Sequence, residues 1–319
     1  MNKSRGVEIR NDLKELLVEV PFDLANLKAN IILPEIGVTE TAGTMKVLPA
    51  KVAHKLGDTV RADSGAYDRT TFNLAEDDFR TRLYGCEEAI DNIAELETSS
   101  IFSQEEVAGM MARNRLLLGR EKRVADTVFN TTTFTGAGYT GAASKVWSDV
   151  TADFRDDIWE AHKKIRSRLM LGLGSMSLIL TSDRIRDMIE TLAAKDAIKY
   201  NVAMLLNNEA SQLSALATYI GVKQIVAVDP MADKAGLDLK GDFDFLYPNN
   251  QAMLAVLSGG ANSWRIGGLG RQPVFTKLAS DYLMESYDEE ATDTRVVRAK
   301  EYRGQKVFKD YGFLLTGIA

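Results

Sequence analysis

The stretch that decides the fold is residues 282–318, which reads YLMESYDEEATDTRVVRAKEYRGQKVFKDYGFLLTGI. Alternating polar and apolar residues predict β-strands on either side of a single turn at Arg303-Gly304. The stretch closes on GFLLTGI, which predicts an apolar strand in place of a polar tail. An apolar strand at such a position needs a partner strand, so we expect these residues to complete a sheet.

Length and composition indicate a folded protein with a large core. A chain of 319 residues exceeds the size at which one core usually stops growing, which predicts one large domain or two closely joined domains. The apolar fraction is 45% and the charged fraction 26%, and no window reaches the roughly 18 apolar residues of a membrane span. No apolar leader is visible and Cys86 is the single cysteine, so we expect no membrane contact, no disulfide and synthesis in a reducing cytoplasm.

The charge balance argues against a dedicated nucleic-acid binder. The net charge is −6, whereas nucleic-acid-binding domains concentrate Lys and Arg to neutralise phosphates. The best candidate for a local contact is the basic stretch at 113–123, RNRLLLGREKR. Its charges alternate with apolar residues on a predicted helix, which favours a solvated or partner-facing surface over contact with DNA.

The first half of the chain predicts extended structure followed by a long helix. Residues 1–33 have weak helical spacing and suggest an arm, and the Gly- and Pro-containing segment 34–80 predicts a two-stranded excursion with alternating stretches at 45–52 and 68–74. So few of its residues are apolar that the excursion needs a neighbour to lie on. Ser103 and Glu106 then have capping-box spacing, and apolar residues at helical intervals predict a helix over 104–129, roughly 39 Å long. Residues 130–146 are rich in Gly and Thr and mark an internal boundary.

The second half predicts alternating helices and strands. A helix over 154–169 has one apolar face, with acidic residues early and basic residues late, as the helix dipole favours. Ser182 is the expected N-cap of a further helix over 183–194, and Gly221 is expected to end a helix over 209–220. Strands are predicted at 176–180, 222–228, 243–247 and 252–257.

The residues of this sequence that could take part in catalysis or bind a ligand are better explained by structural roles. His54, His162 and Cys86 have no metal-ligand neighbours at suitable spacing, and the glycine clusters at 172–174 and 267–270 lack the context of a phosphate loop. The junction at 180–183 is the one strand-to-helix step where an anion could sit, although Ser182 as a plain N-cap explains it better. We therefore predict no catalytic residue, no cofactor and no metal site, and a protein that is not an enzyme.

The order of these segments resembles a known family. The chain begins with an arm and an extended loop containing 60–66 (VRADSGA), followed by 84–88 (YGCEE) and a long helix ending in 120–125 (REKRVA). After these come a Gly/Thr linker with Trp147, a further helix, an SLIL strand, a Gly-Val strand and a β-rich terminus. This order is similar to that of tailed-bacteriophage major capsid proteins of the Hong Kong 97-type fold.

The resemblance implies an α+β fold with five parts. These are an N-terminal arm (1–33), an extended β-hairpin loop (34–80), a peripheral domain with a spine helix (81–146), an α/β axial domain (147–275) and return strands of the peripheral domain (276–319). It implies hexamers and pentamers that form an icosahedral shell around double-stranded DNA, assembled in the bacterial cytoplasm. Implied partners are other copies, scaffold, portal or decoration proteins, and weakly bound DNA. Charged loop residues are the candidate contacts between subunits: Lys51, Lys55, Asp58, Arg61, Asp63, Asp68 and Arg69.

Two alternatives remain open from the sequence. One is an encapsulin-like bacterial compartment shell with the same fold. The other is a nucleotide- or sugar-modifying α/β enzyme built on residues 150–260.

Overall fold

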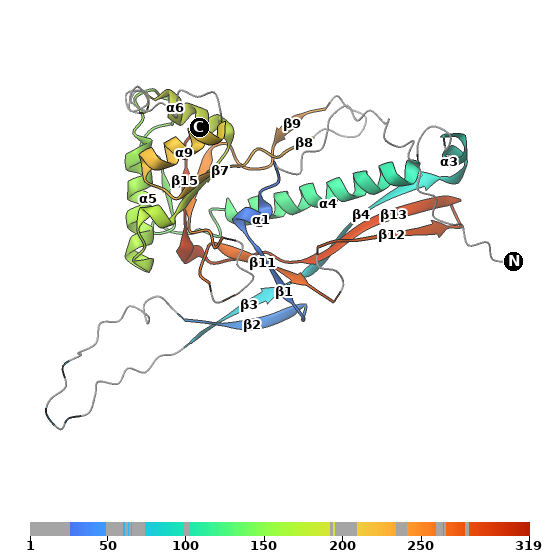
Figure 1. The fold of residues 1–319 in the computed structure, drawn as a ribbon, viewed down its shortest axis with the longest axis horizontal. Helices are drawn as coiled ribbons and strands as arrows, with labels where there is room; N and C mark the ends of the chain where they lie inside the picture. The colour runs from blue at the N-terminus through green and yellow to red at the C-terminus, as the bar shows by residue number, and fades with distance from the viewer. Residues whose placement is uncertain are drawn as a thin grey trace.

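The computed structural model describes residues 26–48, 60, 63, 65, 74–98, 103–191, 194, 209–233, 241–259, 264, 266–277 and 281–319. These residues form an elongated body with a helix-covered sheet at one end and a long helix running to the other end, while a narrow hairpin projects away from both (Figure 1). None of the described helices is both long enough and apolar enough to span a membrane.

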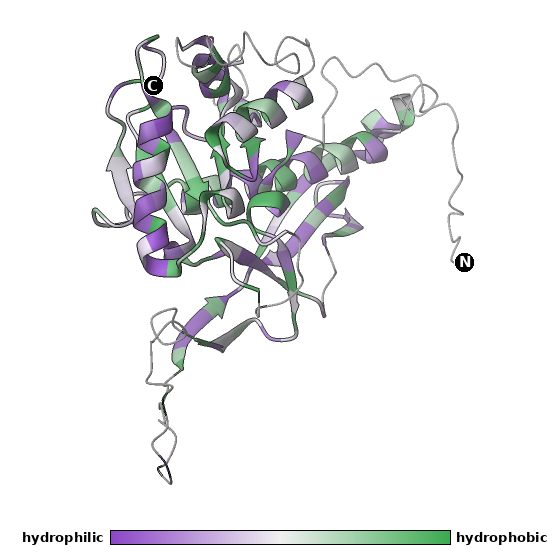
Figure 2. Ribbon diagram, turned by 60° about the vertical axis from the view of Figure 1, so that its left-hand side comes forward, coloured by the Kyte–Doolittle hydropathy of each residue, from purple (hydrophilic) through white to green (hydrophobic). Residues whose placement is uncertain are grey.

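The compact end is built on a five-stranded sheet in the order β5-β15-β10-β6-β7. These strands are β5 (Thr140–Ala142), β6 (Ser177–Leu180), β7 (Gln224–Ala227), β10 (Gln251–Ala255) and β15 (Gly312–Thr316). Three helices accompany it: α5 (Phe154–Leu169), α6 (Ser182–Glu190) and α9 (Glu209–Ile220). In Figure 2 the strands are coloured hydrophobic and the surrounding helices mix hydrophobic and hydrophilic residues.

Both faces of this sheet are buried, which explains its continuous apolar strands. On one face, Leu178 and Leu254 pack in a core with residues of the three helices. On the other face, Ile179 and Met253 pack in a second core with the end of the long helix, including Val128. Strands enclosed on both faces have no polar side, so β6 reads SLIL and not as an alternating pattern.

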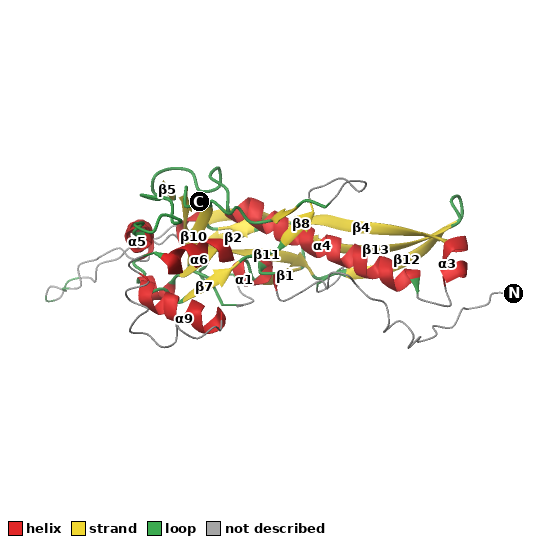
Figure 3. Cartoon of the chain, turned by 90° about the horizontal axis from the view of Figure 1, so that it is seen from above, coloured by secondary structure: helices red, strands yellow, loops and turns green. Residues whose placement is uncertain are grey.

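The long helix α4 (Gln104–Val128) lies along the three long strands of a six-stranded sheet, β4 (Arg82–Asp91), β13 (Thr294–Arg303) and β12 (Leu283–Glu289), as Figure 3 shows from above. β13 is central and pairs antiparallel with both neighbours. The predicted N-cap is confirmed, because the Ser103 side chain accepts a hydrogen bond from the Glu106 backbone N–H. Short helix α3 (Asn92–Thr98) follows β4.

The projecting hairpin consists of β2 (Ala42–Val47) and β3 (Ala75–Arg80), paired antiparallel, and confirms the predicted two-stranded excursion. Its second strand covers Ala75–Arg80, whereas all but the last residue of the stretch predicted at 68–74 lies outside the described residues. Both faces of β3 are largely exposed, so its sequence AEDDFR has no apolar alternation for a pattern to detect.

Short elements complete the chain and connect the two ends. Helix α1 (Ala29–Ile32) leads into β1 (Glu35–Val38), which pairs parallel with β11 (Gly270–Phe275), so residues 35–38 belong to the body and not to the projecting loop. β11 also pairs with β13 and with β14 (Lys306–Val307). A separate small ladder joins β8 (Met231–Asp233) to β9 (Phe243–Phe245), and 3-10 turns lie at Leu173–Ser175 and Lys309–Tyr311.

Most predicted elements are confirmed, including α4, α5, α9 and the strands β6, β7, β9 and β10. The prediction of a single turn in 282–318 was wrong, since β12 and β13 are joined by a further turn at residues 290–293. Asp293 has a positive φ of 49° there, a conformation that Asp tolerates better than most residues. Strand β15 lies in the five-stranded sheet, whereas the whole terminal stretch was expected in the sheet beside the long helix.

The helix predicted over 183–194 also differs from the observed one. α6 begins one residue earlier and ends at Glu190, where Thr191 turns extended and its hydroxyl donates to the Met188 carbonyl. Ser182 is inside the helix and not its N-cap, which is Thr181. The backbone N–H of Ser182 donates instead to Asp229 at 2.8 Å, so a carboxylate of the chain itself occupies the position considered for a ligand anion.

Candidate functional site

Of the seven charged loop residues predicted to contact a neighbouring subunit, the structure describes Asp63, which is exposed in a turn. The others lie outside the described residues: Lys51, Lys55, Asp58, Arg61, Asp68 and Arg69. The geometry of the candidate site therefore comes from the base of the loop, the hairpin β2–β3, and from the way the body holds it.

Polar contacts join the two strands of the hairpin. The Thr44 hydroxyl donates to Asp78 at 2.9 Å, and the Lys46 ammonium pairs with Glu76 at 2.5 Å. Both members of the Lys46–Glu76 pair are more than half exposed, so this pair contributes little to stability. Hydrogen bonds of the ladder, and not an apolar core, hold the hairpin.

Contacts between the body and the hairpin are found along strand β3 in the described part of the chain. Lys306 on β14 pairs with Asp77, and the Phe79 ring stacks on Trp264 with centroids 5.7 Å apart. At the turn after β13, Gly304 lies so close to the hairpin that a Cβ there would sit 2.2 Å from the Arg80 carbonyl oxygen. These contacts set the direction in which the hairpin leaves the body, and the strand faces beyond them remain available to a neighbour.

A buried ion cluster lies where the hairpin base, the long helix and β13 meet. Glu301 on β13 is fully buried and accepts from Arg120 on α4 at 2.6 Å and from Arg123. Arg303, also fully buried, pairs with Glu35 of β1 at 2.7 Å and with Asp281 at 2.9 Å. The cluster thus ties α4, β13, β1 and the residue before β12 into one unit.

Charges within the cluster compensate one another. Burial alone would lower the pKa of Arg120, but the neighbouring Glu301 and Asp281 carboxylates outweigh it and raise the pKa. For Arg123, the effect of burial exceeds that of the neighbouring Glu301 carboxylate, so the pKa of Arg123 is lowered. A buried cluster of this kind is strongly destabilised when one partner is removed, because a charge is left without compensation. The cluster is therefore a rigid joint between the long helix α4 and the strands β13 and β1.

A second buried carboxylate anchors the start of the described chain. Glu121 on α4 accepts from the Ala29 backbone N–H at 2.7 Å and from the Tyr247 hydroxyl at 2.5 Å. Burial raises the pKa of Glu121, and burial with the nearby carboxylate raises that of Tyr247. Glu121 thus fastens helix α1, which leads out of residues 1–28, to the long helix.

Residues with catalytic potential have structural environments. His162 is buried, and its Nε2 lies 3.1 Å from the Leu171 carbonyl oxygen. Cys86 is half-buried on β4, and burial raises the pKa of its thiol. Within the described ranges, no group of three His, Cys, Asp or Glu side chains could hold a metal ion.

Sequence reasoning missed the ion cluster, although a signal was present. On β13 every second residue from Val297 to Arg303 is buried, and the last two of that series are charged: Val297, Ala299, Glu301, Arg303. Charged residues on the buried side of an alternating strand indicate an internal ion pair. The partners of Glu301 on α4 are about 180 residues away in sequence, and no local pattern reveals them.

Comparisons with known proteins identify the architecture. No protein-family model matches the chain, and no curated protein matches it. A crystal structure of a phage-related protein from Bordetella bronchiseptica RB50 aligns with TM-score 0.66 at 14% identity, covering 93% of this chain and 94% of that one. The capsid of cyanophage P-SCSP1u aligns with TM-score 0.57 at 10% identity, over 88% and 86% of the two chains. The capsid of a native GTA particle aligns with TM-score 0.56 at 12% identity, over 98% and 96%. The chain has the Hong Kong 97-type α+β fold of phage capsid structures.

Proposed function

We propose that this protein is a major capsid protein whose copies assemble as hexamers and pentamers into an icosahedral shell around double-stranded DNA. The observation that carries the proposal is the fold, which matches capsid structures from end to end and not merely over one module. The matched chains include the mature capsid of bacteriophage PhiM1, at TM-score 0.52 and 13% identity.

The projecting hairpin supports this role. In the described strands β2 and β3, every residue except Met45 is exposed or only partly buried. A ribbon of two strands is at best marginally stable alone in water, so a neighbour's surface is the natural support for it. We propose that the projecting part of this loop, from the β2–β3 hairpin outward and without residues 35–38, lies across an adjacent subunit, and that its charges (Lys51, Lys55, Asp58, Arg61, Asp63, Asp68 and Arg69) make the contact.

The division of labour follows from the same proposal. Residues 81–146 carry the spine helix, and residues 147–275 surround the symmetry axis of each capsomer. Of residues 276–319, we assign β12 and β13 to the peripheral part and β15 to the axial part, in line with their sheets. The role requires no catalysis. Scaffold, portal or decoration proteins and weakly held DNA are the proposed partners, with assembly in the host cytoplasm before the subunit becomes part of the virion.

Electron microscopy of the expressed full chain tests the proposal. We expect closed particles with icosahedral symmetry, and a chain that stays monomeric over a wide range of concentration and salt would refute it. Particles that enclose a protein cargo in place of DNA would indicate the compartment-shell alternative.

Charge reversal tests the role of the loop. Arg61→Glu and Arg69→Glu should impair particle formation while the subunit's thermal transition stays nearly unchanged, because exposed charges alter folding free energy by under about 1 kcal/mol. Lys164→Glu, an exposed charge on α5, is the matched control and should assemble like the parent. If both loop variants assemble like this control across a range of salt, the loop charges do not make the contact.

A further inference from the structure

The basic stretch of α4 contains one cation without an anion. Its cations are Arg113, Arg115, Arg120, Lys122 and Arg123. Four of them form ion pairs within the subunit: Arg115 with Glu88, Arg120 with Glu301 and Asp281, Lys122 with Asp126, and Arg123 with Glu301. Among the residues that the structure describes, Arg113 forms no ion pair or hydrogen bond, and its Nε is buried without an acceptor.

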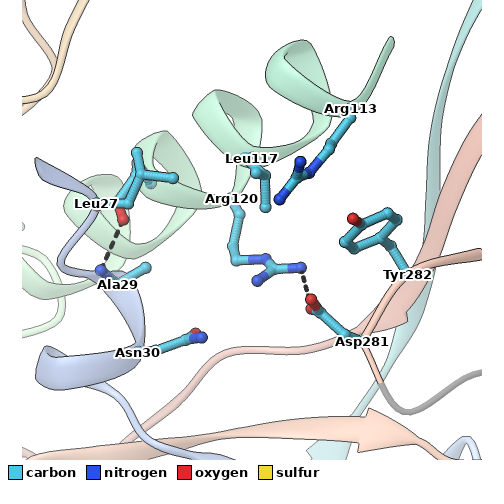
Figure 4. A pocket seen from close by; sticks show the side chains of 9 residues that line it. Leu27, Ala29, Asn30, Arg113, Leu117, Arg120, Asp281 and Tyr282 are labelled. Carbon is cyan, nitrogen blue, oxygen red and sulfur yellow. Dashed lines mark hydrogen bonds and ion pairs between the residues drawn. The ribbon is translucent and has the colours of Figure 1, made fainter. Parts of the chain in front are cut away.

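Arg113 borders a cavity of about 190 Å³ between α1, α4 and the residues before β12. Figure 4 shows Arg113, Tyr282 and Asp281 on the right of the view, Arg120 in the centre and Asn30 at the lower left. The Arg113 guanidinium lies 5.5 Å from the centroid of the Tyr282 ring, which holds it without offering a negative charge.

The acidic groups of the cavity are already engaged elsewhere. Asp281 accepts from both Arg120 and Arg303, and the two oxygens of Glu121 accept from Ala29 and Tyr247. Among the described residues, Arg113 is therefore the cation of the cavity lining without a carboxylate partner. A planar guanidinium that borders a small cavity is suited to a carboxylate, which it can bind through two parallel hydrogen bonds.

We propose that this cavity receives a carboxylate side chain from a second copy of the chain, with Arg113 as its principal contact. The inference rests on the proposed function, because it requires copies that pack against one another. A cavity of this size is below the roughly 300–1,000 Å³ of small-molecule sites and admits a single side chain. The chain has 45 Asp and Glu against 39 Lys and Arg, so each copy has carboxylates to offer.

DNA phosphate is the less suitable occupant. Proteins that hold the DNA backbone present several free cations in a row, whereas the other cations of this stretch are neutralised inside the subunit. One cation beside a small cavity selects one small anionic group.

Particle assembly provides the first test. Arg113→Gln should raise the subunit concentration needed for assembly at least about tenfold, which corresponds to the loss of one charge-assisted hydrogen bond for each contact. Lys122→Gln is the matched control on the same helix, since its exposed pair with Asp126 contributes little, and should change that concentration less than about threefold. Equal assembly by the two variants overturns the proposal, whereas a parent chain that forms no particles overturns the proposed function as well.

Cross-linking identifies the occupant even if Arg113→Gln fails to fold. Arg113→Lys places a primary amine at the cavity, and a carbodiimide couples an amine to a carboxylate in contact with it. Particles assembled from a mixture of ¹⁴N- and ¹⁵N-labelled R113K chains should yield a peptide containing position 113 that is joined to an acidic peptide of the other isotope. A cross-link only within one chain, or none at this position, overturns the proposal. Loss of packaged DNA from Arg113→Gln particles that assemble normally would also overturn it, in favour of phosphate.

Discussion

Removing the Glu301 carboxylate should be among the most damaging single changes to this subunit. Glu301 is fully buried and contacts three arginines: Arg120, Arg123 and Arg303. Glu301→Ala leaves these guanidinium groups close together without the anion between them. Because two of them are themselves almost fully buried, water cannot replace the lost carboxylate.

The expected magnitude follows from the burial of the pair. Loss of one partner of a buried ion pair costs about 3–5 kcal/mol, a large part of the roughly 5–15 kcal/mol that stabilises a typical domain. The exposed pair Lys46–Glu76 provides the comparison, since both side chains are more than half in solvent. Glu76→Ala should cost under about 1 kcal/mol.

Urea unfolding of the unassembled subunit, followed by circular dichroism, measures both costs. Glu301→Gln separates charge from shape, because the amide keeps the size of the side chain but not its charge. Its free energy of unfolding should therefore fall between that of the parent and that of Glu301→Ala. A Glu301→Ala variant within about 1 kcal/mol of the parent would show that the cluster is not a joint and that solvent or rearrangement compensates the arginines.

Three further changes test other parts of the structure. Burial raises the folded-state pKa of Glu121 above its unfolded value, so the contribution of this group to stability is fully present below the unfolded pKa and is lost as pH rises through the folded pKa. The free energy of unfolding of Glu121→Gln, relative to that of the parent, should therefore increase from acidic to neutral pH. A difference that stays constant with pH would contradict this. Gly304→Ala should cost roughly 1–3 kcal/mol by urea unfolding because its Cβ would meet the Arg80 carbonyl, whereas Gly172→Ala, with nothing within 4 Å, is the control and should be close to neutral. Cys86 should react more slowly with a thiol reagent at pH 8 than a free cysteine does, because burial raises its pKa; reaction at the free rate would place the thiol in solvent.

Elements whose signals are local could be predicted from the order of amino acids alone. The apolar face of α5, with Ile158 and Ile165 buried, follows the helical period, and its acidic start and basic end follow the helix dipole. The Ser103 cap of α4 and the positive φ of Gly221 after α9 were likewise predictable, because each depends on a few neighbouring residues. The order of these elements was enough to predict the fold class.

Only the tertiary structure decided how distant segments pair. Strand β5 was invisible in a Gly/Thr-rich linker because it is three residues long and exists by pairing with β15. Ser182 lost its predicted capping role because the helix begins one residue earlier, and its own backbone N–H donates to Asp229, a carboxylate from a distant segment. Arg120 and Glu301 become partners only once α4 lies on β13. A cap or a helical period depends on residues within one turn, whereas an ion pair or a strand partner depends on which surfaces the whole chain buries together.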